Sequence, residues 1–178
     1  VDAIIYAWYL GEQGGNAIAE IIFGDSNPSG KLPFTIPRST DQLPDYKDYS
    51  MKNRTYRYIQ YIPMYPFGFG LSYSPIKFSD FNFSDDIFKI GNSMTASLQV
   101  ENISDKYTEQ VIQMYITQPD SNYLNPKFSL KQFKRIFLGP REKKIITFLL
   151  TSQMLESFDV NGNSKLQTGT YKTVSYTH

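Results

Sequence analysis

The stretch Tyr65-Pro66-Phe67-Gly68-Phe69-Gly70-Leu71-Ser72-Tyr73 decides how this chain is organised. Its proline fixes the backbone angle φ, and its glycines can adopt conformations that are closed to other residues. Its aromatic side chains can bury large apolar areas where two structural units meet. The stretch therefore predicts a rigid, packed connector between an α/β-type segment and an all-β segment.

The segment before the connector has the pattern of one strand–helix unit. Residues 3–10 form an apolar run of strand length, and the glycine-rich turn at 11–15 ends it. Asn16 is a predicted helix N-cap, and Gly24 is the expected left-handed residue after the helix. Because one such unit cannot bury both of its faces, the rest of the sheet is expected upstream or in a partner. The chain is interpreted as a piece of a longer protein.

The segment after the connector has the alternating pattern of a β-sandwich. Apolar residues occupy every second position of 94–100 and of 112–116, and further β-rich runs cover 128–138, 145–150 and 170–176. Short strands separated by turn residues are typical of immunoglobulin or fibronectin type III domains. The predicted fold class is mixed: residues 1–37 end an α/β-sandwich domain, 38–75 form an ordered connector, and 76–178 form a fibronectin type III-like domain. Its last strand is expected to be truncated.

The composition excludes several classes of function. The chain has 18 basic and 17 acidic residues, and this balance gives no electrostatic case for nucleic acid or an anionic membrane surface. No apolar run approaches the ~20 residues that span a bilayer. There is no cysteine, and the only histidine is His178. A Ser-His-Asp triad or a histidine-rich zinc site is therefore not expected, and neither is a cofactor. Any chemistry would depend on carboxylates.

The segment Arg54-Thr55-Tyr56-Arg57-Tyr58 holds the candidate substrate-adjacent residues Arg54, Tyr56 and Arg57. Guanidinium groups stack on aromatic rings and bind carboxylates with two hydrogen bonds, so such a segment could line a sugar site. The more frequent alternative is structural, with the same side chains fastening a loop onto a domain surface.

Three weaker patterns carry further expectations. Asn53, Asn82 and Asn102 begin N-x-S/T triplets and are candidate N-glycosylation sites. The segment 159–163 resembles the start of a calcium loop, but its Asn-Gly pair is more typical of a hairpin turn. A basic cluster is predicted to lie on solvated strand edges, where it would discourage aggregation: Lys131, Lys134, Arg135, Arg141, Lys143 and Lys144.

Several of these segments, in this order, resemble family 3 glycoside hydrolases, of the β-xylosidase and β-glucosidase branches. The resemblance rests on residues 11–19, 23–25 and 27–33, on 54–58 and 65–73, and on 111–115 and 133–135. It covers nearly the whole chain. Two departures are Thr108 and Gln110 where the family usually has Gly and Glu, and Arg141 where it usually has Gly.

The resemblance implies a retaining exo-glycosidase that acts on terminal β-xylosyl or β-glucosyl residues of an oligosaccharide or aryl glycoside. In that family an Asp nucleophile lies in an N-terminal (β/α)₈ barrel. The Glu acid/base lies upstream of the turn that matches residues 11–16. No catalytic residue is therefore expected in this segment, which would act mainly as a scaffold for the missing barrel and α/β domain.

Alternatives stay open at this point. The chain could be a non-catalytic module that binds glycans or forms oligomers such as a homodimer, or part of a catalytically dead homologue. The expected location is extracellular, secretory or lysosomal, or periplasmic in a bacterium.

Overall fold

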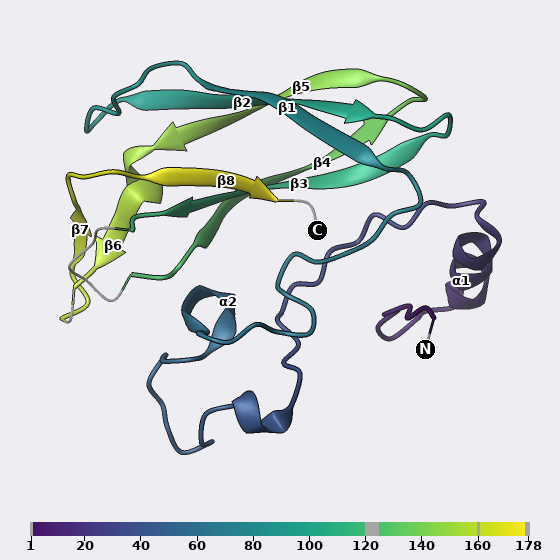
Figure 1. Cartoon of the computed structure of the whole chain (residues 1–178), viewed down its shortest axis with the longest axis horizontal. Helices are drawn as coiled ribbons and strands as arrows, with labels where there is room; N and C mark the ends of the chain where they lie inside the picture. The colour runs from purple at the N-terminus through teal and green to yellow at the C-terminus, as the bar shows by residue number, and fades with distance from the viewer. Residues whose placement is uncertain (1, 120–124, 160, 177–178) are drawn as a thin grey trace.

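A computed structural model describes residues 2–119, 125–159 and 161–176 of the chain. Its main body is a pair of antiparallel three-stranded sheets that face each other (Figure 1). One sheet has the order β1-β2-β5, with β1 Ile76–Phe83, β2 Ser93–Asn102 and β5 Lys143–Thr151. The other has the order β4-β3-β8, with β3 Thr108–Thr117, β4 Ser129–Leu138 and β8 Lys172–Tyr176. The hairpin β6 Glu156–Phe158 and β7 Ser164–Leu166 follows the short helix η2 Ser152–Leu155.

The core of the sandwich follows from the alternating sequence pattern. Every second residue of β2, from Met94 to Val100, is buried, and the intervening residues are more exposed. These side chains pack against Ile112, Met114 and Ile116 from β3 and against Phe148 and Leu150 from β5. Burying one large apolar side chain contributes about 1.5–3 kcal/mol. The sandwich therefore has a hydrophobic core of its own, as the alternation predicted.

In the turn between β4 and β5, the backbone of Arg141 adopts a left-handed conformation that glycine usually occupies. Arg141 has φ +57°, in the left-handed region that favours glycine. Its N–H donates to the Ser104 carbonyl at 3.1 Å, and its guanidinium holds the Asp105 carboxylate with bonds of 2.8 and 3.3 Å. The pKa of Asp105 is lowered mainly by its hydrogen bond from Arg141. The backbone of this turn is therefore compatible with the family's glycine.

The N-terminal part forms helix α1, Gly14–Phe23, which lies to one side of the sandwich (Figure 1). Gly24 ends it with φ +81° and donates its N–H to Ile21, as predicted. The predicted N-cap at Asn16 is wrong by three residues, because the cap is Gln13, whose side-chain oxygen accepts from the Asn16 amide at 2.6 Å. The predicted strand at residues 3–10 does not form in the described structure, because no described strand pairs with it. Its side chains, such as Ile4 and Tyr9, are exposed.

An extended segment at residues 32–36 pairs with the end of the connector at residues 65–69. Leu32 donates its N–H to the carbonyl of Phe69 at 2.8 Å, and Gly68 donates to the carbonyl of Leu32 at 2.7 Å. Ile36 and Tyr65 form an isolated antiparallel bridge. The sequence between them contains two short helices, η1 Thr40–Gln42 and α2 Thr55–Tyr58, on the long loop that the sequence predicted to be ordered.

Candidate functional site

The connector is anchored on the outer face of strand β3 by a cluster of aromatic rings. Tyr56, from α2, stacks on Phe67 with ring centroids 4.1 Å apart and planes at 16°. Both rings meet Tyr115 of β3 edge-on, at 6.2 and 6.4 Å. Phe128 contacts Tyr56 and Tyr115 from the start of β4. Such pairs contribute about 0.5–1.5 kcal/mol each beyond the area they bury. This cluster fixes α2 and the connector against the sandwich.

Tyr56 also forms a polar contact with the sandwich backbone, because its hydroxyl oxygen accepts from the N–H of Leu130 at 3.1 Å. We expect Tyr56→Phe to lower the free energy of unfolding by about 1–2 kcal/mol, since the ring stays while a part-buried N–H loses its acceptor. Tyr56→Ala should cost more, because it also removes the stacking on Phe67. Denaturant unfolding of both variants checks this, and equal losses would contradict a separate role for the hydroxyl.

Arg54 fixes the loop before α2. Its guanidinium donates to three backbone carbonyls, those of Ser50 at 3.2 Å, Asp45 at 3.0 Å and Asp48. These bonds close the loop 45–54 on itself. The hydrogen-bonding capacity of Arg54 is therefore largely used within the protein, which favours the structural alternative for this residue.

Arg57 is placed differently from Arg54. Its backbone carbonyl accepts from Lys127 N–H at 2.7 Å, and its guanidinium carbon lies 5.6 Å from the centre of the Tyr58 ring. Its Nε is shielded from solvent and has no hydrogen-bond partner among the described residues. Arg57 and Tyr58 line a cavity of about 150 Å³ together with residues of β3, β4 and β6. The three predicted substrate-adjacent residues thus do not converge on one site.

A polar junction that the sequence did not reveal joins residues 27–29 to the sandwich. The amide nitrogen of Asn27 donates to the hydroxyl of Thr108 on β3. Its side-chain oxygen accepts from the N–H of Tyr73 at 2.8 Å and from the Ser72 hydroxyl at 3.0 Å, both at the end of the connector. The Arg135 guanidinium pairs with Glu109 on β3 and donates to the Ser29 hydroxyl at 3.3 Å. Asn27 and Ser29 looked like ordinary turn residues, because their partners are 40 to 110 residues away in the sequence. This junction fastens residues 27–29 to the end of the connector and to strands β3 and β4 of the sandwich.

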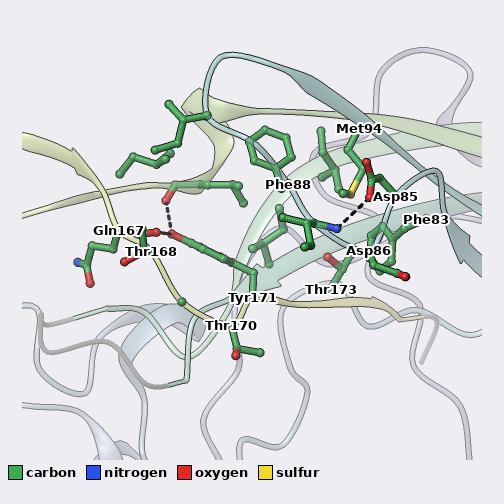
Figure 2. A pocket seen from close by; sticks show the side chains of 17 residues that line it. Phe83, Asp85, Asp86, Phe88, Met94, Gln167, Thr168, Thr170, Tyr171 and Thr173 are labelled. Atoms are coloured by element: carbon green, nitrogen blue, oxygen red, sulfur yellow. Dashed lines mark hydrogen bonds between the residues drawn. The ribbon is translucent and has the colours of Figure 1, made fainter.

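A cavity of about 510 Å³ opens at one end of the sandwich (Figure 2). Its walls include the core residues Met94, Ile116 and Leu150, and Phe88 packs against that core. Tyr171 donates its hydroxyl to the carbonyl of Gln167 at 2.8 Å. The carboxylates of Asp85 and Asp86 are neighbours on one loop, whereas a glycosidase pair faces each other across a sugar. The cavity is therefore a gap between the sheets without an opposed acid–base pair.

The three candidate glycosylation sites differ in exposure. Asn82 is exposed on β1, and Asn53 is partly buried at φ +59°. Asn102 is fully buried, and its amide nitrogen donates to the carbonyls of Lys106 at 2.7 Å and Gly139 at 2.8 Å. The expectation for Asn102 conflicts with this geometry, because both amide hydrogens are used and no room for a glycan remains.

Two other observations concern metals and membranes. No group of three or more acidic, cysteine or histidine side chains suited to a metal ion occurs in the described part of the chain. Among the helices that the structure describes, none combines the length and apolar character required to cross a bilayer.

The basic cluster is only partly solvated. Lys144 donates to the Phe137 carbonyl at 2.5 Å, and Lys134 donates to the Thr147 carbonyl, so both link β4 to β5 across the sandwich edge. Lys131 is half-buried, and burial lowers the pKa of its amine. Lys134 stays exposed and the side chain of Lys144 is 41% exposed, as the prediction of solvated strand edges requires, so the prediction is wrong only for the half-buried Lys131.

Comparison with known proteins agrees with this architecture. Residues 1–73 match the family model described as the glycosyl hydrolase family 3 C-terminal domain, and residues 110–174 match the fibronectin type III-like domain. The periplasmic beta-glucosidase of Salmonella typhimurium is 38% identical over 87% of this chain, which spans 22% of that protein. The xylan 1,4-beta-xylosidase of Xylanibacter ruminicola is 38% identical over 92% of this chain, which spans 18% of that protein.

Solved structures of family 3 beta-glucosidases also match most of this chain. The crystal structure of the Bifidobacterium adolescentis GH3 beta-glucosidase matches 94% of this chain with a TM-score of 0.80 and 30% identity, and this chain covers 27% of it. The chain thus spans about a fifth to a quarter of the proteins it matches. With matches to both domain models and to relatives over most of its length, this chain belongs to glycosyl hydrolase family 3, as a C-terminal portion that joins a piece of the α/β domain to the fibronectin type III-like domain.

Proposed function

We propose that this chain is the C-terminal portion of a retaining, exo-acting β-glycosidase that removes terminal β-D-xylosyl or β-D-glucosyl residues, and that the segment itself is mainly a scaffold. The observation that carries the proposal is a double attachment to the sandwich: the aromatic cluster around Tyr56 fastens the connector, and residues 27–29 are fastened through Thr108 and Arg135. A rigid attachment of this kind is needed where one domain holds another in a fixed position.

The unpaired N-terminal part supports attachment to a larger body. Ile4, Trp8, Ile22 and Phe23 are between 58% and 81% exposed, although apolar side chains of this size normally pack against a neighbour. The extended run at residues 3–10 and helix α1 supply two such surfaces, and the upstream part of an α/β domain would cover both. The same observation disfavours an independent glycan-binding module, which would keep these faces in water.

In the proposed enzyme two carboxylates, one nucleophilic and one acid/base, form and hydrolyse a glycosyl-enzyme intermediate. Neither is proposed to lie in this segment. The residues of this chain would act by position: Arg54 holds the loop before α2, Tyr56 fastens the connector to the sandwich, and Asn27 links the end of the connector to Thr108 of β3. An extracellular or periplasmic location is part of the proposal, supported by the periplasmic beta-glucosidase among the relatives.

The test is hydrolysis of aryl β-xylosides and aryl β-glucosides by the native protein that carries this sequence. We expect turnover by a protein several times larger than the 20.5 kDa of this chain, and none by residues 1–178 alone. A denatured mass near that of this chain would contradict the proposal and favour a binding or structural module. A large protein that hydrolyses neither substrate would favour a catalytically dead homologue or another sugar.

Arg54→Ala in the active protein separates the two interpretations of that residue. Because the guanidinium is bonded to three carbonyls, we expect a loss of stability of about 1–3 kcal/mol, with the Michaelis constant nearly unchanged. A large rise in the Michaelis constant at full stability would instead assign Arg54 to the substrate site. Thermal unfolding and steady-state kinetics on the same preparation distinguish the two results.

A further inference from the structure

The cavity of about 150 Å³ beside α2 brings together two positively charged side chains that the proposed function does not use. Arg57 enters from α2 in the connector, and Lys131 enters from β4 in the sandwich. Among the described residues, neither has a carboxylate within ion-pair distance, although other basic residues of β4 and β5 do. Two like charges that face one cavity, without an ion-pair partner among the described residues, are unfavourable unless a negative group joins them.

The position of Lys131 results from an irregularity in the sheet. Met114 pairs with Gln132 and Tyr115 pairs with Leu130, so Lys131 is the extra residue of a β-bulge between β3 and β4. Bulges redirect a side chain and occur preferentially at sheet edges and next to functional sites. The bulge therefore explains why a lysine, rather than a core residue, faces this partly enclosed space.

The donors in the cavity have unmet hydrogen-bonding capacity. The Nε of Arg57 is shielded from solvent without an acceptor, and the structure describes no acceptor for the Lys131 amine. The pKa of Lys131 is lowered first by burial and second by the positive charge of Arg57. The two positive charges are therefore close enough to repel each other. A shielded donor without an acceptor is unfavourable, so an acceptor beside these two side chains would stabilise the protein.

The cavity walls carry little opposing charge. Glu156 lines the cavity, but its carboxylate accepts from the hydroxyl of Ser164, its neighbour on the β6–β7 hairpin. The negative charge of Glu156 raises the pKa of Lys131, but this effect is smaller than the lowering by burial and by Arg57. The remaining polar groups on the wall, including Ser129, Asn125 and Tyr58, can donate or accept. The charged side chains that the structure describes on the cavity wall, Arg57, Lys131 and Glu156, therefore sum to a positive charge.

We propose that this cavity binds a small oxyanion, a carboxylate, phosphate or sulfate group, held between the guanidinium of Arg57 and the ammonium of Lys131. The chemistry fits, since arginine presents paired donors to such groups and lysine adds a point charge. The volume, about 150 Å³, is below the ~300–1,000 Å³ of drug-sized ligand sites and suits a single charged group or one sugar acid. Binding would fasten α2 to β4 across the boundary between connector and sandwich.

The test is calorimetric titration of the full-length protein that carries this chain, with inorganic phosphate in one arm and glucuronate in the other. Glucose serves as the neutral counterpart of glucuronate, and sodium chloride keeps the ionic strength constant. We expect saturable binding of at least one anion in excess of glucose. Tighter binding of glucuronate identifies a sugar acid as the source of the group, and tighter binding of phosphate identifies a free inorganic anion.

Variants connect the binding to the cavity. Arg57→Gln and Lys131→Gln should each weaken the anion at least tenfold, whereas Lys89→Gln, which removes the same charge from an exposed loop outside the cavity, should leave the affinity within twofold. Unfolding temperatures without anion show that each variant is folded, and Lys131→Gln decides the matter if Arg57→Gln does not fold. No saturable binding, or binding that both substitutions leave unchanged, overturns the proposal. Neither readout requires glycosidase turnover, so failure here is distinct from failure of the proposed function.

Discussion

Gly68→Val is expected to detach the connector from the sandwich and to lower the free energy of unfolding by about 3–5 kcal/mol. Gly68 has φ +82°, a conformation in which a β-branched residue is strained. A Cβ atom there would also lie 2.6 Å from the hydroxyl oxygen of Tyr115 and against the side-chain oxygen of Gln113. Both side chains are buried and hydrogen-bonded to each other, so neither can move aside at low cost.

The matched control for this substitution is Gly15→Ala. Gly15 lies in α1, where an added Cβ would meet nothing within 4 Å and φ is not positive. Because alanine is the better helix former, we expect no loss, or a gain of about 0.5–1 kcal/mol. Denaturant unfolding of the protein carrying each variant, followed by tyrosine and tryptophan fluorescence, checks both. A Gly68→Val protein as stable as wild type would show that the connector does not depend on its contact with β3.

Asn102→Asp is expected to destabilise the sandwich by about 3–5 kcal/mol. The side chain of Asn102 is 0% exposed, and its amide nitrogen donates to the carbonyls of Lys106 and Gly139. Its oxygen accepts from the N–H and hydroxyl of Ser104, at 3.0 and 2.7 Å. Aspartate would replace both donated bonds by repulsion between a buried carboxylate and two carbonyl oxygens. Because protonation removes that charge, the deficit should shrink as the pH is lowered.

Asn82→Asp is the control, because it makes the same chemical change at an exposed position of β1. There the amide donates only to the carbonyl of Asp80, at 3.1 Å, and solvent can replace that bond. We expect an effect within about 0.5 kcal/mol. Equal effects of the two substitutions on the unfolding midpoint would contradict the role assigned to Asn102 as a buried link between the 102–106 turn and the β4–β5 turn.

The predictions from sequence were most accurate where the alternation of apolar and polar residues along a strand distinguishes its buried face from its exposed face. Alternation in β2 predicted its strand and its buried face, and the same pattern identified Ile112, Met114 and Ile116 on β3. Gly24 was correctly predicted to end the helix in a left-handed conformation, because glycine has no side chain and commonly occupies that position. The Asn161-Gly162 pair lies in the turn that joins β6 to β7, as predicted for a hairpin, with Gly162 at φ +81°.

Predictions were weaker where a residue's surroundings come from distant segments. Gln113 and Tyr115 alternate with the core residues of β3 and should face solvent, yet they are only 5% and 2% exposed because the connector covers them. The run at residues 3–10 has the composition of a buried strand, but a strand needs neighbouring strands for its hydrogen bonds. None of the described strands supplies them, so the pattern alone did not decide the structure.

By itself, the sequence determined the family, the β-sandwich and the lack of cysteine chemistry in this segment, because these depend on residue type and short-range periodicity. Only the tertiary structure decided that Arg54 closes a loop, that Arg57 and Lys131 share a cavity, and that Asn102 is buried with both amide hydrogens used. The physical reason is that the partners of these side chains come from other segments or from the backbone, and a sequence pattern does not record which polar groups meet when sheets and loops pack together.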